Sequence, residues 1–256
     1  MLISNYKKLL IGAAALPLLG LGCQVNSPGI AKSPIKIMNQ ESVTFETSDG
    51  ITISADWYPA ESAHRFALLL HMMPSTKESW EPLAAALQEA GIAVLAIDLR
   101  GHGESTQSAK GHLDYKAFED EDHHDSIRDV DAAVAWLKQR GASDSNVVVA
   151  GASIGANLAI LYGSQHKETS AIVALSPGLD YHGVKTEAAV TGLAENQKLM
   201  LVVASGDTYS FDSVSRLDEL AATEHQTSRY QGTEHGTNLF ETDPELISKI
   251  VAFVSP

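Results

Sequence analysis

The sequence of 256 residues contains a single cysteine, Cys23, and few basic residues. One cysteine excludes an intramolecular disulfide and a cluster of thiolate metal ligands. Lys and Arg number 18 against 32 Asp and Glu, so the formal net charge is −14. A surface with this excess of negative charge argues against a nucleic-acid partner and against electrostatic docking on anionic lipid. The sequence also shows no internal repeat, and its length fits one domain with a full core.

The cysteine lies at the end of a segment that has the features of an export signal. Residues 1–22 contain two lysines, then an apolar stretch over 9–19, and small residues close to Cys23. This pattern resembles a bacterial lipoprotein signal, in which the cysteine becomes the lipidated N-terminus. Residues 20–22 (GLG) depart from the usual box, which has Leu first and a small residue second. A plain secretory signal and an uncleaved anchor helix are the alternative interpretations.

The resemblance to a lipoprotein signal implies a location and a domain plan. We expect residues 1–22 to be removed, Cys23 to carry the lipid, and residues 23–41, which are polar and contain Pro and Gly, to form a tether. Gln24 rather than Asp follows the cysteine, which favours the outer membrane, facing the periplasm. Contact with the membrane is therefore expected through the lipid anchor alone, and the folded domain over residues 42–256.

From residue 42 onward, patterns typical of strands alternate with patterns typical of helices. Apolar and polar residues alternate on both sides of the turn at residues 48–50, which predicts an antiparallel hairpin at one edge of a sheet. A shorter polar strand is expected over 228–231. Continuous apolar runs, typical of strands covered on both faces, occupy residues 66–70, 92–97, 146–150, 171–175 and 199–204.

This alternation predicts an α/β fold, with a mostly parallel sheet of about eight strands and helices on both faces. Only about 20 residues separate the strand that ends near Ser176 from the one that begins near Leu199, which is enough for one short helix. A large cap domain is therefore not expected.

One strand-to-helix junction contains a catalytic motif. The sequence Gly151-Ala152-Ser153-Ile154-Gly155 follows an apolar strand run and precedes a helical pattern. G-x-S-x-G in this context is typical of a nucleophile elbow, whose glycines allow the sharp turn that exposes the serine hydroxyl. The first N–H groups of the helix would then meet negative charge that develops on a substrate oxygen. The alternative interpretation is an ordinary turn between a strand and a helix.

A serine hydroxyl is a poor nucleophile at neutral pH, so it needs a general base and a group that orients the base. His235 lies in a loop after the last predicted strand, where an imidazole can reach Ser153. His225 is the alternative base, in a segment that resembles the end of a helix. Asp207 follows the preceding strand and is the expected acceptor of the second imidazole N–H, with Asp180 as the alternative.

The order Ser153, Asp207, His235 on alternating strands and helices resembles the α/β-hydrolase family, in particular its cap-less serine esterases and dienelactone-hydrolase-like members. The sequence His71-Met72-Met73-Pro74 is similar to the His-Gly-x-x loop of that family. The resemblance implies that the backbone N–H groups of Met73 and Ile154 form the oxyanion hole. Met72 replaces the usual glycine, which leaves both methionines open as the donor.

Two further tracts are interpreted as structural. Residues 98–105 (DLRGHGES) are similar to the D-x-R-G-x-G-x-S turn of the family, in which charged hydrogen bonds hold a loop beside the site. The acidic tract at residues 119–125 contains two histidines, but adjacent residues at the start of a helix point in different directions. No metal site and no cofactor are expected.

These features together predict a serine hydrolase that cleaves a carboxylic ester or thioester of a small-molecule acyl substrate through an acyl-enzyme. The absence of a large cap favours small or exposed acyl groups. A peptidase or amidase of the same fold is the alternative enzyme. An envelope lipoprotein that keeps the fold but only binds a ligand or partner is the alternative outside enzymes.

Overall fold

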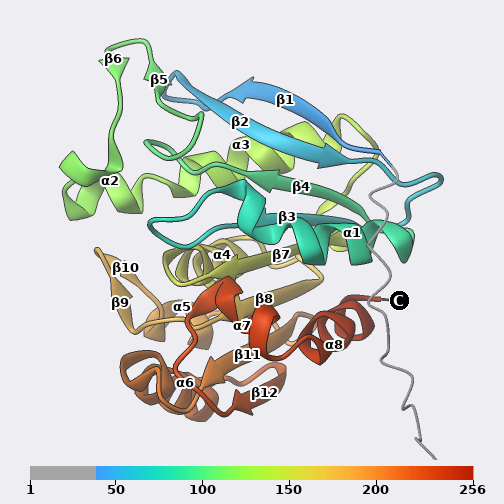
Figure 1. Ribbon diagram of the computed structural model, residues 1–256, viewed down its shortest axis with the longest axis vertical. Helices are drawn as coiled ribbons and strands as arrows, with labels where there is room; N and C mark the ends of the chain where they lie inside the picture. Colours follow the sequence, from blue (N-terminus) through green and yellow to red (C-terminus); the bar gives the residue numbers. More distant parts are fainter. Residues whose placement is uncertain (1–38, 256) are drawn as a thin grey trace, which may run out of the picture. The chain divides into compact units, whose positions relative to one another are not determined.

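The computed structural model describes residues 39–255 (Figure 1). The predicted signal at residues 1–22, the lipidation site Cys23 and most of the tether at 23–41 lie outside the described residues. Within residues 39–255, no helix has both the length and the apolar character needed to cross a bilayer.

A sheet of ten strands runs through the described part of the chain, in the order β12-β11-β8-β7-β3-β4-β2-β5-β6, with β1 paired to β2. The six strands from β12 to β4 are parallel, and β2 and β1 are antiparallel to their neighbours. This arrangement confirms the expected mostly parallel sheet with a hairpin at one edge. The strands are β1 (Glu41–Glu46), β2 (Ile51–Tyr58), β3 (Phe66–Leu70), β4 (Ala93–Ile97), β5 (Gln107–Ser108), β6 (Gly111–His112), β7 (Val147–Ala152), β8 (Ala171–Leu175), β11 (Lys198–Ala204) and β12 (Glu224–Tyr230).

Helices cover both faces of the sheet, as expected (Figure 1). One apolar cluster joins one face to α3, α4, α5 and α6, and a second cluster joins the other face to α1, α7 and α8. Successive strand residues alternate between the two clusters because side chains on a strand point to opposite faces. The helices are α1 (Glu81–Glu89), α2 (Asp120–His124), α3 (Ile127–Lys138), α4 (Ile154–Gln165), α5 (Glu187–Thr191), α6 (Thr208–Leu220), α7 (Leu239–Thr242) and α8 (Glu245–Val254).

The sequence-based prediction for β12 was wrong in its start. The strand begins at Glu224 rather than near residue 228, so His225 lies in a strand and not at the end of a helix. β12 is an outer strand that pairs only with β11, so several of its side chains remain partly exposed. Polar residues are tolerated there, and the apolar signal that identifies inner strands is missing.

The segment between β8 and β11 contains α5, the one short helix that the sequence predicts, and no large cap. It also contains a two-stranded hairpin, β9 (Asp180–Tyr181) and β10 (Val184–Lys185), which the sequence did not indicate. The hairpin turn contacts α2, where the rings of His123 and His182 are 4.5 Å apart. The hairpin therefore has a packed position beside the carboxyl ends of the parallel strands.

Candidate active site

The loops at the carboxyl ends of the parallel strands contain the three predicted catalytic residues and Met73. Parallel strands end at the same edge of a sheet, so the loops after β3, β7, β11 and β12 lie at one edge. These loops carry Met73, Ser153, Asp207 and His235, respectively. His225 pairs in register with Leu199 at the beginning of β11, so it lies at the opposite edge, away from Ser153.

Ser153 forms the turn between β7 and α4 and has a φ of 53°, in the left-handed region. Non-glycine residues rarely adopt this conformation, and it is typical of strained functional turns. The flanking glycines are required by close backbone contacts. A Cβ on Gly151 would lie 2.0 Å from the carbonyl oxygen of Gly155, and a Cβ on Gly155 would lie 2.3 Å from that of Leu70. The G-x-S-x-G sequence is therefore needed to pack the elbow against the end of β3.

His235 and Asp207 form a direct pair: the distance from His235 Nδ1 to Asp207 Oδ2 is 2.7 Å. Because Nδ1–H donates to the carboxylate, Nε2 is left with a lone pair that can accept a proton. Burial acts to raise the pKa of Asp207, but the hydrogen bond and the charge of His235 outweigh it and keep the pKa below its usual value. Asp180, the alternative acid, instead accepts the N–H of Gly183 in the hairpin turn.

Ser176, directly after β8, holds the loop that carries the base. Its side chain is fully buried and its φ is 50°. Ser176 Oγ accepts the N–H of Gly236, the residue after the base, at 3.0 Å. No motif surrounds Ser176, and a serine that follows a buried strand is common, so this role could not be predicted from the sequence.

The candidate oxyanion donors are backbone N–H groups at the elbow and after β3. Among the hydrogen bonds of residues 39–255, none has the N–H of Ile154, Met72 or Met73 as donor. The three N–H groups thus have no acceptor among these residues, and the choice between Met72 and Met73 stays open. His71 holds this loop, since its Nδ1–H donates to the carbonyl of Met72 and its Nε2 accepts the N–H of Leu99.

A buried ion pair that the sequence did not reveal fixes the turn at residues 98–105. Lys77 Nζ lies 2.8 Å from Asp98 Oδ2, and the side chains are 3% and 0% exposed. Asp98 also accepts the N–H groups of Lys77 and Glu104. Burial acts to lower the pKa of Lys77, but its bonds to Asp98 and Glu104 outweigh burial and raise the pKa. The loop beside the site is therefore held by charge-assisted hydrogen bonds.

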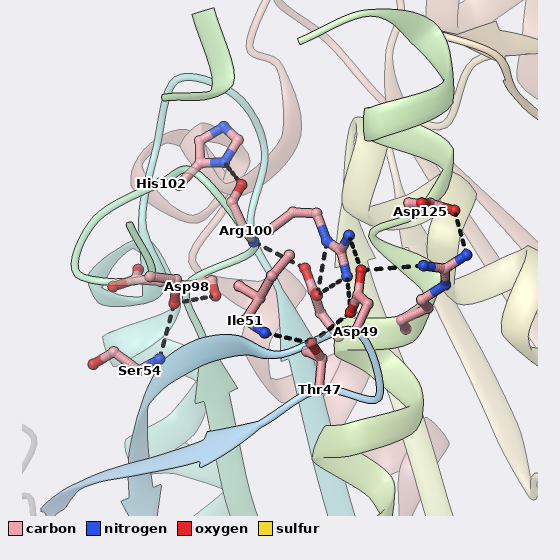
Figure 2. Close-up of polar contacts among 11 residues, drawn as sticks. Thr47, Asp49, Ile51, Ser54, Asp98, Arg100, His102 and Asp125 are labelled. Atoms are coloured by element: carbon pink, nitrogen blue, oxygen red, sulfur yellow. Dashed lines mark hydrogen bonds and ion pairs between the residues drawn. The ribbon is translucent and has the colours of Figure 1, made fainter. Parts of the chain in front are cut away.

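Arg100 holds the other half of the same turn. Its guanidinium bonds both to Asp49, from the β1–β2 turn, and to the carboxylate of Asp129. Figure 2 shows Arg100 beside Asp49. Arg100 Nε donates to Asp129 Oδ1 and Nη1 donates to Asp49 Oδ2, each at 2.9 Å. Burial raises the pKa of Asp129 to about 6, although Arg100 acts to lower it. These contacts agree with the structural interpretation of the D-x-R-G-x-G-x-S sequence.

The acidic tract at residues 119–125 makes contacts that support a helix. The side chains of Glu119 and Asp122 form a capping box at the start of α2, and Asp125 pairs with Arg128 at 3.2 Å. Within residues 39–255, no group of three or more His, Cys, Asp or Glu side chains is arranged to hold a metal ion.

The sheet order, the elbow and the His235–Asp207 pair define an α/β hydrolase. Residues 61–243 match the protein family described as serine aminopeptidase, S33, and the chain belongs to this family. The fold is also similar to that of solved hydrolases. The esterase Pf2001 of Pyrococcus furiosus is 22% identical, with a TM-score of 0.68 over 84% of this chain and 91% of that chain. The dienelactone hydrolase of Anabaena variabilis is 18% identical, with a TM-score of 0.61 over 84% and 94%.

Curated relatives match over shorter stretches. The thermostable monoacylglycerol lipase of Bacillus sp. (strain H-257) is 30% identical over 141 residues, which cover 55% of this chain and 51% of the lipase. The bifunctional esterase/perhydrolase of Acinetobacter calcoaceticus is 35% identical over 97 residues, 38% of this chain and 31% of that protein. The chain thus spans about half or less of the length of these two relatives.

Proposed function

We propose that the protein is a serine hydrolase of carboxylic esters or thioesters, with Ser153 as nucleophile, His235 as general base and Asp207 as the group that orients the base. The observation that carries this proposal is the 2.7 Å bond between His235 and Asp207, at the sheet edge where Ser153 forms the elbow. A base whose Nδ1–H is bonded to a partly buried carboxylate, and whose Nε2 keeps its lone pair, has the orientation that proton transfer from a serine requires.

In the proposed reaction, His235 Nε2 takes the Ser153 proton while Oγ attacks the carbonyl carbon. The carbonyl π electrons move to oxygen, and the oxyanion accepts hydrogen bonds from the N–H groups of Ile154 and Met73. Collapse of the tetrahedral species breaks the bond to the leaving group, which takes the proton from the imidazolium. Water then attacks the acyl-enzyme by the same route. His235 takes the proton of the water and returns it to Ser153, which releases the carboxylic acid.

An ester is the preferred substrate because the named activities of several relatives are ester cleavage, including the lipase and the esterases above. The segment between β8 and β11 contains only a hairpin and α5, which favours small or exposed acyl groups. Peptide or amide cleavage is the second candidate, since the family is described as a serine aminopeptidase. Hydrolysis of p-nitrophenyl butyrate, compared with an aminoacyl p-nitroanilide, distinguishes the two.

The proposed location is the bacterial cell envelope, with the lipid on Cys23 as the anchor in the outer membrane, facing the periplasm. Support comes from the signal-like pattern of residues 1–22. Growth of expressing cells with an alkyne fatty acid should label the wild type and not Cys23→Ser. Labelling of both proteins, or of neither, would contradict the anchor without affecting the proposed reaction.

The decisive experiment for the proposed reaction is labelling of the full chain with a fluorophosphonate probe. The wild type should react, while Ser153→Ala should not, and His235→Ala should react at least about 10²-fold more slowly because the base contributes a factor of this order. Thr237→Ser, in the same loop as His235, serves as a control that keeps the triad. If the folded wild type does not react, a non-catalytic binding protein with this fold becomes the better explanation.

A further inference from the structure

Tyr209 is the one large apolar side chain in residues 39–255 that is exposed, at 48%. It lies in the first turn of α6, two positions after Asp207. A single exposed aromatic side chain is common on protein surfaces and does not mark a site by itself. The contacts of this ring, and its place in a row of rings that leads to the proposed base, set it apart.

The ring of Tyr209 is held at its hydroxyl and along one edge. The hydroxyl accepts the N–H of Asp180 at 3.1 Å and donates to the carbonyl of the same residue at 2.9 Å. A Cβ on Gly178 would lie 2.8 Å from Cε1 of Tyr209 and 2.7 Å from Cε2 of Tyr181, so the glycine lets the backbone pack against both rings. The position of Tyr209 is therefore fixed before a ligand arrives, and a ligand loses little free energy in ordering it.

Tyr181 connects this ring to the base. Its ring is 5.4 Å from that of Tyr209, with the planes at 66°, and 6.3 Å from that of His235, with the planes at 88°. The Tyr181 hydroxyl forms a hydrogen bond of 2.9 Å with that of Ser210, which is fully buried. Tyr181 is partly buried and Tyr209 is exposed, so the two rings form an aromatic wall that extends from His235 to the surface.

The leaving group is the part of the substrate that must meet His235. In the proposed reaction it takes a proton from Nε2, so its oxygen comes within hydrogen-bond distance of the imidazole, roughly 3 Å. The substituent on that oxygen therefore begins beside the ring that Tyr181 contacts. The acyl group begins instead at the carbonyl carbon, which is bonded to Ser153.

We propose that the aromatic wall of Tyr181 and Tyr209 binds an aromatic leaving group, so that the preferred substrates are esters of aryl or arylmethyl alcohols. This inference rests on the proposed function, because it assigns the substrate class of the same site. Two rings set steeply to one another present both a face and an edge, and aromatic groups prefer offset-stacked or edge-to-face contacts with such rings. Tyr209 thus determines specificity and takes no part in the proton transfer.

The test is the ratio of kcat/KM for benzyl butyrate to kcat/KM for cyclohexylmethyl butyrate, measured with the full chain. The two esters share their acyl group and have alcohols of similar size, of which only one is aromatic. Tyr209→Leu keeps an apolar side chain but removes the ring, so this ratio should fall about two- to tenfold, the amount that an aromatic pair adds beyond its buried area. Because both esters are measured on the same sample, a smaller folded fraction cancels in the ratio.

Phe211→Leu is the matched control, since it removes a ring from the same helix. The guanidinium of Arg229, on β12, lies over that ring at 5.9 Å, so Phe211 is directed to β12 and the ratio should match that of the wild type. A second pair of esters, methyl phenylacetate and methyl cyclohexylacetate, has the aromatic ring in the acyl group. Their ratio should not change in Tyr209→Leu.

An unchanged butyrate ratio in Tyr209→Leu would overturn the inference and leave the serine hydrolase intact. An equal fall in Phe211→Leu would also overturn it, as would a fall for the acyl pair, which would assign the wall to the acyl group. A wild type that reacts with a fluorophosphonate but cleaves neither butyrate would refute the proposed substrate class. A wild type that does not react with the fluorophosphonate would instead refute the proposed function.

Discussion

Replacement of Gly155 by alanine tests the closest backbone contact at the proposed site. The Cβ of an alanine at this position would lie 2.3 Å from the carbonyl oxygen of Leu70 and 2.7 Å from that of His71. A carbon and an oxygen in contact need roughly 1 Å more than the shorter of these distances. Backbone on both sides cannot rotate away as a side chain can, so α4 and the loop after β3 must separate.

That separation acts on two measurable quantities. Overpacking of this kind lowers the free energy of unfolding by about 1–3 kcal/mol. The two candidate oxyanion donors lie on opposite sides of the contact, Ile154 on α4 and Met73 on the loop. A displacement of about 1 Å between them should lower kcat/KM for p-nitrophenyl butyrate about 10²-fold.

Gly163→Ala is the matched control because it makes the same change in the same helix. Its Cβ would meet the side-chain atoms of Ile172 at 2.8 Å and of Leu193 at 3.2 Å, which can move. Alanine in the interior of a helix also gains up to about 1 kcal/mol over glycine, which offsets part of the cost. We expect this variant to keep its activity within about threefold. Wild-type activity in Gly155→Ala would refute the reasoning, as would an equal loss in both variants.

Two other perturbations test the loops beside the site. Lys77→Met leaves Asp98 buried without its cation, so the free energy of unfolding in urea should fall by about 3–5 kcal/mol; an unchanged urea midpoint would contradict this. Burial is the main cause that lowers the pKa of His71 and of His102 from 6.5 to about 4. Between these pH values the unfolded chain binds more protons than the folded one. The free energy of unfolding is therefore highest above pH 6.5, and it falls as the pH decreases toward 4, by up to about 3 kcal/mol for each histidine. His102→Phe keeps the ring stacked on Tyr115 and should flatten this slope in urea denaturation at pH 7, 5.5 and 4.5, whereas an identical slope would show that other groups titrate.

The inner strands could be predicted from the sequence because they are covered on both faces. Five apolar runs became β3, β4, β7, β8 and β11 with small changes at their ends. The start of β12 could not be predicted in the same way, since an outer strand tolerates polar residues. The β9–β10 hairpin was missed for a different reason. Its strands have two residues each and depend on contacts with α2 and α6 rather than on a local pattern.

The elbow could be predicted because its requirements are local. Gly151 and Gly155 lie within one turn of each other, and a Cβ on Gly151 would collide with the carbonyl oxygen of Gly155. The requirement for glycine can therefore be recognised in five consecutive residues of the sequence. His235 and Asp207 are 28 positions apart, but parallel strands bring their loops to one edge. The parallel sheet predicted from the alternation of strands and helices was thus sufficient to expect them at the same edge. Their roles, like that of Met73, stay predictions until activity is measured.

Ser176 illustrates what this kind of reasoning cannot reach. A serine nucleophile demands a base and an acid, and that demand narrows the search to histidines and carboxylates at strand ends. No reaction step demands a serine under the loop of the base, so neither residue type nor spacing selects Ser176, which lies 60 positions from Gly236. Its place depends on β8 lying between β7, which leads to Ser153, and β11, which leads to Asp207. The candidate reacting groups could therefore be chosen from chemistry and chain order, whereas the residue that holds the loop of the base depends on how the strands are arranged.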